Sequence, residues 1–236
     1  FLFQQTLCIP VLATDISGVN PTQGTGHYDI HPDFASGTMG FKHYNNFNLS
    51  QGDVANLIFA LKNGNISLDR FVNLVDTQII INGLLNTIKD GGIGGHAIFV
   101  SPQGMVVGAS GVLNVGALTA IAPTTNAYNK FILDSAISSG FNQGYDYENN
   151  LAILKASDMG ANIDINGKII SRGDVNLYAK QINIGNASAA NKAAIFAGRD
   201  GEHSATELII NLTPFVEAGH YALYFGLQDG NTYRSN

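Results

Sequence analysis

Short apolar runs bounded by turn-forming residues recur along the chain and predict β-strands. Several runs alternate between apolar and polar positions, which gives a strand one apolar and one polar face. The clearest are Ile163-Asp164-Ile165, Val175-Asn176-Leu177 and Ile182-Asn183-Ile184. The pattern predicts an all-β protein of many short strands whose apolar side chains share a core.

The strand-like runs repeat at regular intervals. Ile81, Ile98 and Val115 are 17 positions apart (98 − 81 = 17 and 115 − 98 = 17). Ile79–Gly83 reads Ile-Ile-Ile-Asn-Gly, and Ile163–Gly167 repeats it almost position for position. Self-similarity at about 20 residues is typical of a solenoid, in which each rung buries its apolar side chains against the next.

Asparagine precedes glycine at the expected corners, Asn63-Gly64, Asn82-Gly83 and Asn166-Gly167. Asparagine adopts the left-handed backbone conformation more readily than most residues with side chains, so we expect that conformation there. Asparagines aligned on rungs roughly 4.8 Å apart can also hydrogen-bond in ladders. Both roles are structural.

A Pro/Gly turn joins two apolar strands in the most distinctive stretch of the chain. Pro102 has the φ required at the second position of a β-turn, and Gly104 tolerates positive φ. The apolar runs Ala97–Val100 and Met105–Val107 flank the turn. We therefore expect Ser101–Gly104 to form a tight reversal.

Three segments depart from the repeat. Asp53–Lys62 is either a short helix, begun at Asp53 and ended at Gly64, or a pair of strands. His203–Asn236 has strand-like runs without matching corners, as expected of incomplete rungs, a cap or a frayed end. Residues 124–160 are predicted to form an excursion, of a kind that often carries recognition. The aromatic residues of this excursion are Tyr128, Phe131, Phe141, Tyr145 and Tyr147.

Composition narrows the class of protein. The 236 residues carry only 13% charged side chains and 27 glycines, as suits stacked strands and tight turns, and we expect one domain over residues 20–236. The net charge of −6 comes without a basic block, which argues against nucleic acid as a partner. Cys8 is the single cysteine, so neither an intramolecular disulfide nor a cluster of zinc-binding thiolates can form.

The first residues are strongly apolar. Residues 1–19 are either the remnant of a signal peptide, with Val11 and Ala13 spaced as at a small-residue cleavage site, or a segment that caps the domain. No other apolar stretch approaches the roughly 18 residues that a membrane span requires. We expect a soluble mature chain.

Two groups of polar residues are candidates for chemistry. His27, Asp29, His31 and Asp33 alternate, so a strand would place them on one face, either as a metal site or as the solvated face of a cap strand. The break at Pro32 favours the solvated face.

Asp164 and Asp174 are the best pair of carboxylates for a β-helix polysaccharide lyase or hydrolase, but Arg172 between them favours a surface ion pair. The glycine-rich Gly91–Gly95 lacks the Lys-Ser/Thr of a phosphate loop and reads as a flexible connection between strands. We therefore expect no enzymatic activity, no catalytic residue, no metal and no other cofactor.

The chain resembles the amino-terminal domain of two-partner secretion exoproteins of the filamentous haemagglutinin family, including leukotoxin-like filamentous adhesins. The similar segments follow in the family's order over about residues 20–198, which makes the resemblance fairly specific. They are Phe41–Leu49, Arg70–Val75, Ile81–Leu84, the Ser101–Gly104 turn and Val112–Leu118. Ser101 and Gln103 depart from the family pattern, which usually has asparagines there.

The resemblance implies a right-handed parallel β-helix with an amino-terminal cap and small extra-helical antiparallel sheets. It also implies Sec export to the periplasm and binding by the POTRA domains of a dedicated outer-membrane transporter of the TpsB type. Outside the cell the domain would nucleate folding of the remaining exoprotein, a virulence-associated adhesin of a Gram-negative bacterium. A host cell surface is a further candidate partner, and we expect a monomer.

The family motifs assign recognition by the transporter, or folding, to ten residues: Phe47, Asn48, Asn73, Ile81, Asn82, Gly83, Ser101, Pro102, Gln103 and Gly104. An alternative function from a different class is an adhesin module that binds host glycans directly through the aromatic-rich excursion.

Overall fold

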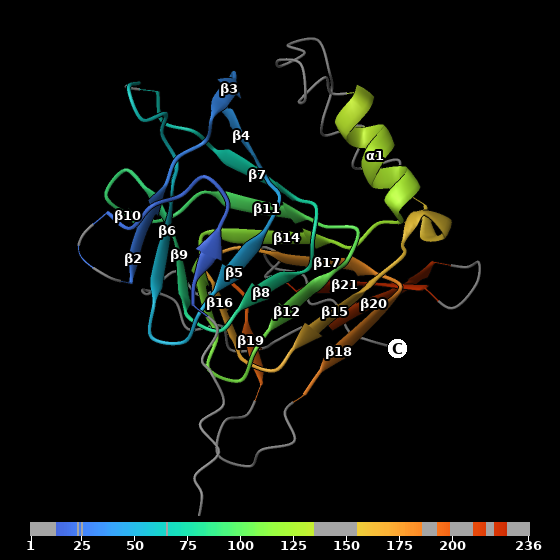
Figure 1. The fold of residues 1–236 in the computed structure, drawn as a ribbon. Helices are drawn as coiled ribbons and strands as arrows, with labels where there is room; N and C mark the ends of the chain where they lie inside the picture. Colours follow the sequence, from blue (N-terminus) through green and yellow to red (C-terminus); the bar gives the residue numbers. More distant parts are fainter. Residues whose placement is uncertain are drawn as a thin grey trace, which may run out of the picture.

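The computed structural model describes residues 13–22, 24, 26–64, 66–134, 155–185, 193–198, 210–215 and 220–225. Most of this chain is β-strand, arranged in three sheets that we call A, B and C (Figure 1). The all-β prediction is therefore confirmed.

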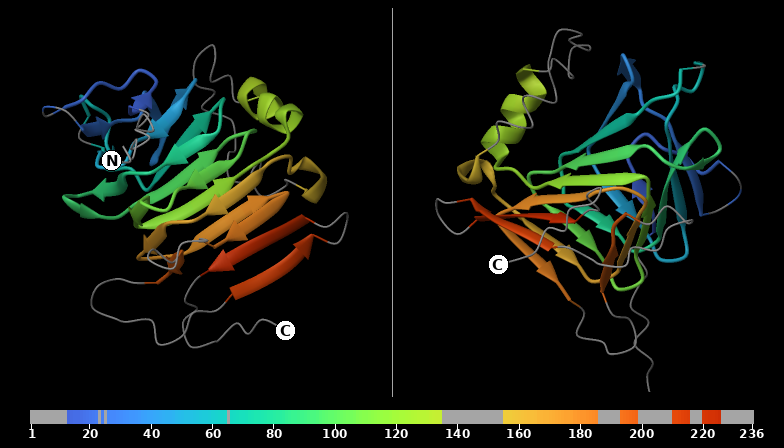
Figure 2. Two further views of the ribbon diagram at one scale, coloured as in Figure 1. Left: turned by 60° about the horizontal axis from the view of Figure 1, so that its bottom comes forward. Right: turned by 180° about the vertical axis from the view of Figure 1, so that it is seen from behind.

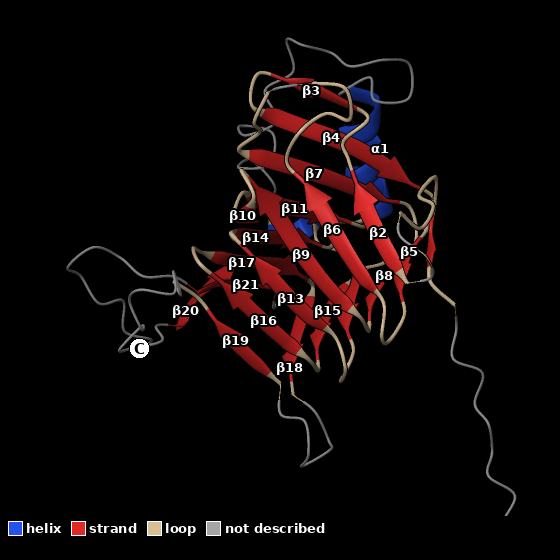
Figure 3. Ribbon diagram, turned by 90° about the vertical axis from the view of Figure 1, so that its left-hand side faces the viewer, coloured by secondary structure: helices blue, strands red, loops and turns tan. Residues whose placement is uncertain are grey.

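Sheet A has, in spatial order, β1 (Asp15–Ile16), β5 (Phe47–Leu49), β8 (Ile79–Ile81), β12 (Met105–Val107), β15 (Asn162–Ile165) and β18 (Gln181–Ile184). Sheet B, seen face-on in Figure 3, has β2 (His27–Ile30), β6 (Val54–Ile58), β9 (Leu84–Lys89), β13 (Val112–Val115), β16 (Lys168–Ser171) and β19 (Ala194–Phe196), with β10 (Gly92–Ile93) beside β9. Sheet C has β3 (Phe34–Ser36), β4 (Met39–Tyr44), β7 (Arg70–Val75), β11 (His96–Val100), β14 (Ala117–Ile121), β17 (Val175–Ala179), β21 (His220–Phe225) and β20 (Ile210–Phe215).

From β4 onward the chain visits sheets C, A and B in the same order five times. We call each visit a passage: β4-β5-β6, β7-β8-β9, β11-β12-β13, β14-β15-β16 and β17-β18-β19. Equivalent strands of successive passages pair in parallel. Antiparallel strands occur beside this stack: β1 on β5, β3 on β4, β10 on β9, and β21 with β20 on β17. Figure 2 shows the passages following one another along the stack, with β20 and β21 at its far end.

The 17-residue spacing predicted from the sequence is not the repeat of the structure. Ile81 lies in sheet A, Ile98 in sheet C and Val115 in sheet B, so these residues do not stack. The true repeat varies: Val72 pairs with Ile98, 26 positions on, whereas Ile163 pairs with Ile182, 19 positions on. The corners between strands differ in length, and no constant period survives that variation.

The predicted match between Ile79–Gly83 and Ile163–Gly167 corresponds to a structural equivalence. Both segments contribute a strand to sheet A, on either side of β12, and Met105 pairs with Ile79 on one side and Ile163 on the other. Identical positions therefore occupy identical places in the stack.

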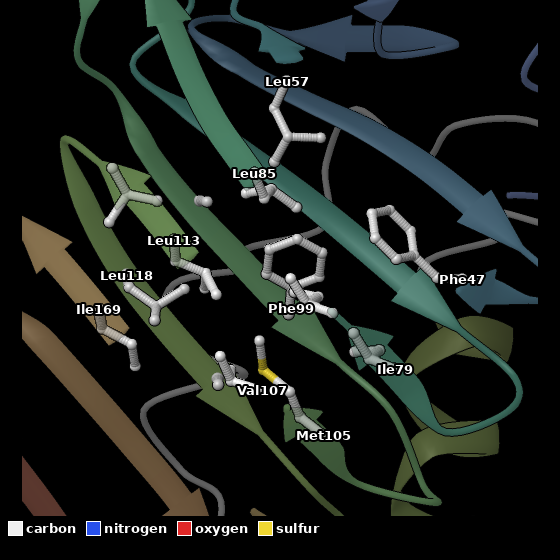
Figure 4. Packing of buried hydrophobic residues seen from close by; sticks show 14 of the residues in the cluster. Phe47, Leu57, Ile79, Leu85, Phe99, Met105, Val107, Leu113, Leu118 and Ile169 are labelled. Atoms are coloured by element: carbon white, nitrogen blue, oxygen red, sulfur yellow. The ribbon is translucent and has the colours of Figure 1, made fainter. Parts of the chain in front are cut away.

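The main core lies between the three sheets, where side chains from successive passages meet (Figure 4). Phe47, Phe99, Val107 and Leu113 are fully buried or nearly so and come from all three sheets. A second core covers the outer face of sheet C, where Phe41, Val72, Leu74, Ile98, Val100 and Ile121 pack with Tyr128 and Met159. The strands β4, β7, β11 and β14 of sheet C thus contribute buried side chains to both faces.

The excursion between β14 and β15 is present. Its described parts are the helix α1 (Thr125–Asp134) and a single turn of 3₁₀ helix, η1 (Ala156–Asp158). Tyr128 of α1 packs on sheet C, whereas Phe141, Tyr145 and Tyr147 lie outside the described residues, as does the side chain of Phe131. No helix in the described ranges is both long and apolar enough to cross a bilayer.

The structure resolves two ambiguous segments. Val54–Ile58 of the Asp53–Lys62 segment is the strand β6, paired with β2 and β9, so the helix alternative is wrong. The glycine-rich Gly91–Gly95 begins with a hairpin: Asp90 and Gly91 both have positive φ, 51° and 81°, and β10 folds back on β9. Asp-Gly is the preferred pair for such a two-residue turn, so this hairpin was readable from the sequence.

At the chain ends, residues 1–12 and 226–236 lie outside the described residues. The strand Asp15–Ile16 pairs with β5, so this part of the predicted segment 1–19 belongs to the fold. The run Ile210–Phe215 and the run His220–Phe225 form an antiparallel pair on β17.

Candidate functional site

The Ser101–Gly104 turn forms as predicted. The Gly104 amide donates to the Ser101 carbonyl at 3.2 Å, and Gly104 has a φ of 81°. The Ser101 hydroxyl, fully buried, donates to the Thr77 carbonyl at 2.6 Å and accepts from the Gln103 amide at 3.1 Å. A Cβ on Gly104 would collide with the Asn162 carbonyl of the next passage. The turn therefore locks sheets C and A together through backbone contacts on both sides.

The corner from sheet A to sheet B requires glycine for a different reason. Neither Asn82 nor Gly83 has positive φ, and nor do Asn166 and Gly167, so the predicted left-handed conformation is wrong. A Cβ on Gly83 would instead meet the carbonyl oxygens of the preceding passage's turn, and Gly167 is equally confined. Close approach between backbones, which is a stacking property, is what selects glycine at these corners.

Asn73 lies inside the main core and is fully buried. Its side-chain oxygen accepts from the Tyr44 hydroxyl at 2.8 Å, and its amide nitrogen donates to the Phe71 carbonyl at 3.0 Å. Burial and the charge of Asp33 raise the pKa of Tyr44 well above its usual value, so this hydroxyl remains a donor. Asn73 therefore anchors β7 to β4 from within.

Phe47 and Asn48 lie side by side on β5, on opposite faces. The Phe47 ring meets the rings of Tyr44 and Phe99 edge-on, at centroid distances of 5.3 and 5.6 Å. Asn48 is 4% exposed, and its amide nitrogen donates to the Ala13 carbonyl at 3.4 Å. Phe47 therefore packs sheet A against sheet C, and Asn48 holds the segment before β1 against β5.

The structure brings most of the ten predicted residues together around sheet A and its two corners, in the first three passages. Ile79 joins two of the motifs, because it pairs with Phe47 and its amide donates to the Gly104 carbonyl at 3.0 Å. Gln103 is exposed, and Asn82 and Pro102 are half-buried. The remaining seven are buried: Phe47, Asn48, Asn73, Ile81, Gly83, Ser101 and Gly104.

Three of the four alternating polar residues near the amino terminus are each tied to a different neighbour. Asp29 accepts from the Asn56 amide at 2.9 Å, His31 donates to the Ala60 carbonyl at 2.9 Å, and Asp33 pairs with Lys42 at 2.5 Å. His27 is exposed. The described part of the chain contains no group of three or more histidine, cysteine, aspartate or glutamate residues that could hold a metal ion.

Asp164 and Asp174 lie at different places in the stack. Asp164 lies on β15 of sheet A, where Asn183 donates to it at 2.6 Å. Asp174 precedes β17 of sheet C, and its carbonyl accepts from the Leu118 amide at 2.9 Å. Arg172 makes no ion pair with Asp174, although both belong to the described chain. The carboxylates therefore lie on different sheets.

A polar cluster outside sheet C was not predicted from the sequence. His43 donates to Asp76 Oδ1 at 2.8 Å, and the Tyr128 hydroxyl donates to the same oxygen at 2.9 Å. Burial, together with Asp76, raises the pKa of Tyr128. The cluster ties α1 to the first two passages, and the 52 positions between Asp76 and Tyr128 leave no local sequence signal for it.

His96 begins β11 and hydrogen-bonds the Thr119 hydroxyl at 2.8 Å. Burial, with a smaller contribution from Arg70, lowers the pKa of His96 to about 4. The imidazole is therefore neutral at physiological pH and belongs to the scaffold.

No family profile matches the chain, and comparisons with curated proteins and with solved structures find no match either.

Proposed function

We propose that this chain is the secretion domain of a two-partner exoprotein, folded as a right-handed parallel β-helix with an amino-terminal cap. The five passages through sheets C, A and B in constant order, with parallel pairing between them, support this architecture. The antiparallel strands β1, β3, β20 and β21 are the proposed cap and extra-helical sheets.

The observation that carries the proposal is the burial of the motif residues. Seven of the ten have no surface to offer a partner once the chain has folded. We infer that a transporter reads these segments in the unfolded chain, where strand edges are available for pairing with a strand of its POTRA domains. Folding then hides the recognition segments, so a domain that folds outside the cell cannot return to the transporter.

The far end of the stack supports the second half of the function. β18 and β19 are the last strands of sheets A and B among the described residues, and they expose Ile184 (44%) and Phe196 (41%). An unpaired strand edge with apolar side chains is a template for further β-structure. The domain would offer these edges to the following part of an exoprotein displayed at the cell surface.

The other functional expectations are parts of the same proposal. The domain acts as a monomer without enzymatic activity or cofactor, reaches the periplasm by Sec export, and binds no nucleic acid. The placement of Asp164 on β15 of sheet A and of Asp174 before β17 of sheet C disfavours the lyase or hydrolase alternative, because glycosidic hydrolysis requires two carboxylates that converge on one face, roughly 5–9.5 Å apart.

Secretion with and without the partner transporter tests the proposal. We expect the domain, expressed with a signal peptide in a Gram-negative host, to reach the medium only when its cognate outer-membrane transporter is present. Purified POTRA domains should capture the urea-unfolded chain on dilution and fail to capture the refolded chain. Transporter-independent release, or equal capture of both forms, would count against the proposal.

The turn glycine gives a matched pair of variants. Gly104→Val forces a β-branched residue into positive φ and against the Asn162 carbonyl, so we expect it to reduce folding and the amount of secreted protein at least severalfold. Gly92→Val, at a position with open space and no positive φ, is the control and should secrete normally. Unchanged secretion and circular dichroism for Gly104→Val would contradict the role given to this turn.

A further inference from the structure

A groove of about 540 Å³ lies at the amino-terminal end of the stack, where the chain leaves β2. It involves none of the ten motif residues. The side chains that give it its character are Pro21, Asp29, His31, Asp33, Lys42 and Lys62. Its size is that of a small-molecule site.

Three acceptor side chains in the groove are each held by one fixed contact. Asp29 Oδ1 accepts from Asn56, and Asp33 Oδ1 pairs with Lys42 at 2.5 Å. His31 donates its Nδ1 proton to the Ala60 carbonyl. Each contact leaves a second polar atom for a ligand: Asp29 Oδ2, Asp33 Oδ2 and His31 Nε2. Side chains fixed in this way bind with little loss of conformational entropy.

One of the two lysines in the groove has an ion pair and the other has none among the described residues. The Lys42 side chain is only 11% exposed and is neutralised by Asp33. Lys62 lines the same groove and is exposed, without a hydrogen bond or ion pair to any described residue. The groove therefore offers one unpaired cation together with several separate hydrogen-bond acceptors.

We propose that this groove binds a carboxylated sugar, such as a hexuronate unit of a glycan. Lys62 would hold the carboxylate, and Asp29, His31 and Asp33 would accept from ring hydroxyls. Asp29 lies on β2, whereas His31 and Asp33 follow the end of that strand, so the three acceptors come from different parts of the lining and require donors spread over a molecule the size of a sugar ring.

Two other ligand classes fit less well. A metal ion is disfavoured by the two lysines and by the absence of a suitable ligand group among the described residues. The zwitterion of an amino acid concentrates its donors on one ammonium group, which cannot reach three separated acceptors. The proposed site is independent of the transport function, because no motif residue contributes to it.

Titration of the purified chain with glucuronate, glucose and glycine tests the proposal by calorimetry or by amide chemical shifts. We expect saturable binding of glucuronate, binding of glucose at least threefold weaker, and none of glycine. Lys62→Ala should weaken glucuronate binding roughly three- to fivefold, as loss of one exposed charge contact does. Lys168→Ala, which removes an exposed lysine from β16, is the matched control and should bind glucuronate normally.

Asp29→Asn keeps an oxygen that accepts from Asn56 but removes the carboxylate from the groove. We expect it to weaken the binding of both glucuronate and glucose, while circular dichroism shows that the chain remains folded. Absence of saturable glucuronate binding by the folded chain, stronger binding of glycine, or equal affinity of the wild type and Lys62→Ala would each overturn the proposal.

Discussion

The first two passages and the last passage are built differently, although both contribute one strand to each sheet. The large rings Phe41, Tyr44, Phe47, Phe59 and Phe71 of the first two passages are buried. In the last passage the buried side chains are the smaller Val175, Leu177, Ala179 and Ile195, and Ile184 and Phe196 are exposed.

The difference has a physical cause. An end of a stack has no neighbouring rung to cover it, so its apolar side chains must be enclosed by local packing. At the amino-terminal end, edge-on ring contacts such as Phe59 with Phe71 at 5.9 Å, together with the Lys42–Asp33 pair, supply that packing. In the last passage only sheet C continues, through β21 and β20, whereas β18 and β19 have no further strand beside them among the described residues. We infer that the amino-terminal end is the consolidated part and a suitable nucleus for folding.

Removal of one buried ring should reveal the largest contrast. Phe47→Ala leaves a cavity beside Tyr44 and Phe99 and should cost about 3–5 kcal/mol of the free energy of unfolding. Phe196→Ala removes a ring that is 41% exposed and should cost less than about 1 kcal/mol. Urea unfolding followed by circular dichroism measures both. Similar losses would show that the two ends are equally consolidated.

Substitution of alanine for glycine at two corners should give a smaller difference in stability. Gly83→Ala would press a Cβ against the carbonyls of Ser50 and Asp53, and we expect a loss of about 2–3 kcal/mol. Gly185, in the corner after β18, has open space around it, so Gly185→Ala should change stability by less than about 0.5 kcal/mol. If Gly83→Ala left the free energy of unfolding unchanged, the backbone at the stacked corners would be able to shift and accommodate a Cβ at little cost.

Features that depend on residues adjacent in the sequence could be predicted from it. The Ser101–Gly104 turn needs only Pro102 and Gly104 in place, and alternating residues such as those of Ile163–Ile165 define a strand with one buried face. The match between Ile79–Gly83 and Ile163–Gly167 also indicated equivalent places in the stack, because corner and strand recur together.

Features that depend on stacking could not be predicted. The spacing of Ile81, Ile98 and Val115 was regular by coincidence, since corner length decides which residues come into register. Glycine is required at Gly83 because the backbone of the preceding passage lies against it, and the residues around Gly83 in the sequence do not reveal that contact. The fold also decides which residues contact Asp76, since Tyr128 reaches it from the excursion, far along the chain.

Acidification should weaken the region around β11 selectively. The folded-state pKa of His96 is about 4, below the ordinary value of 6.5, so the unfolded chain binds more protons between these values. Stability is therefore complete above pH 6.5 and falls as the pH drops toward 4. We expect a loss of about 2 kcal/mol between pH 7.5 and pH 5 from this residue.

His96→Gln, which retains a hydrogen-bonding side chain beside Thr119, should flatten this part of the stability profile. His27→Gln, at an exposed position on β2, is the control and should leave the slope unchanged. Urea unfolding at a series of pH values provides the measurement. A slope that persists in His96→Gln would assign the pH dependence to other groups.

A ladder of asparagine side chains on sheet B runs along the amino-terminal part of the stack and does not reach the last passage. Asn114 donates to Asn86 at 3.3 Å, Asn86 to Asn56 at 3.0 Å, and Asn56 to Asp29 at 2.9 Å, which confirms the predicted ladders. The row ends there, because Ile170 pairs with Asn114. Its amides all point toward the Asp29 carboxylate, so a charge at the amino-terminal end strengthens the series.

Interruption of this ladder should give the smallest effect. Asn56→Ala removes two hydrogen bonds at a half-buried surface and should cost about 1 kcal/mol, whereas Asn176→Ala on β17, whose side chain bonds no described residue, should be near neutral. Additive losses in the double variant Asn56→Ala/Asn86→Ala would show that the Asn86–Asn56 hydrogen bond contributes nothing to stability. A double loss smaller than the sum of the single losses would show that this bond is stabilising, because the first substitution already breaks the contact that the second removes.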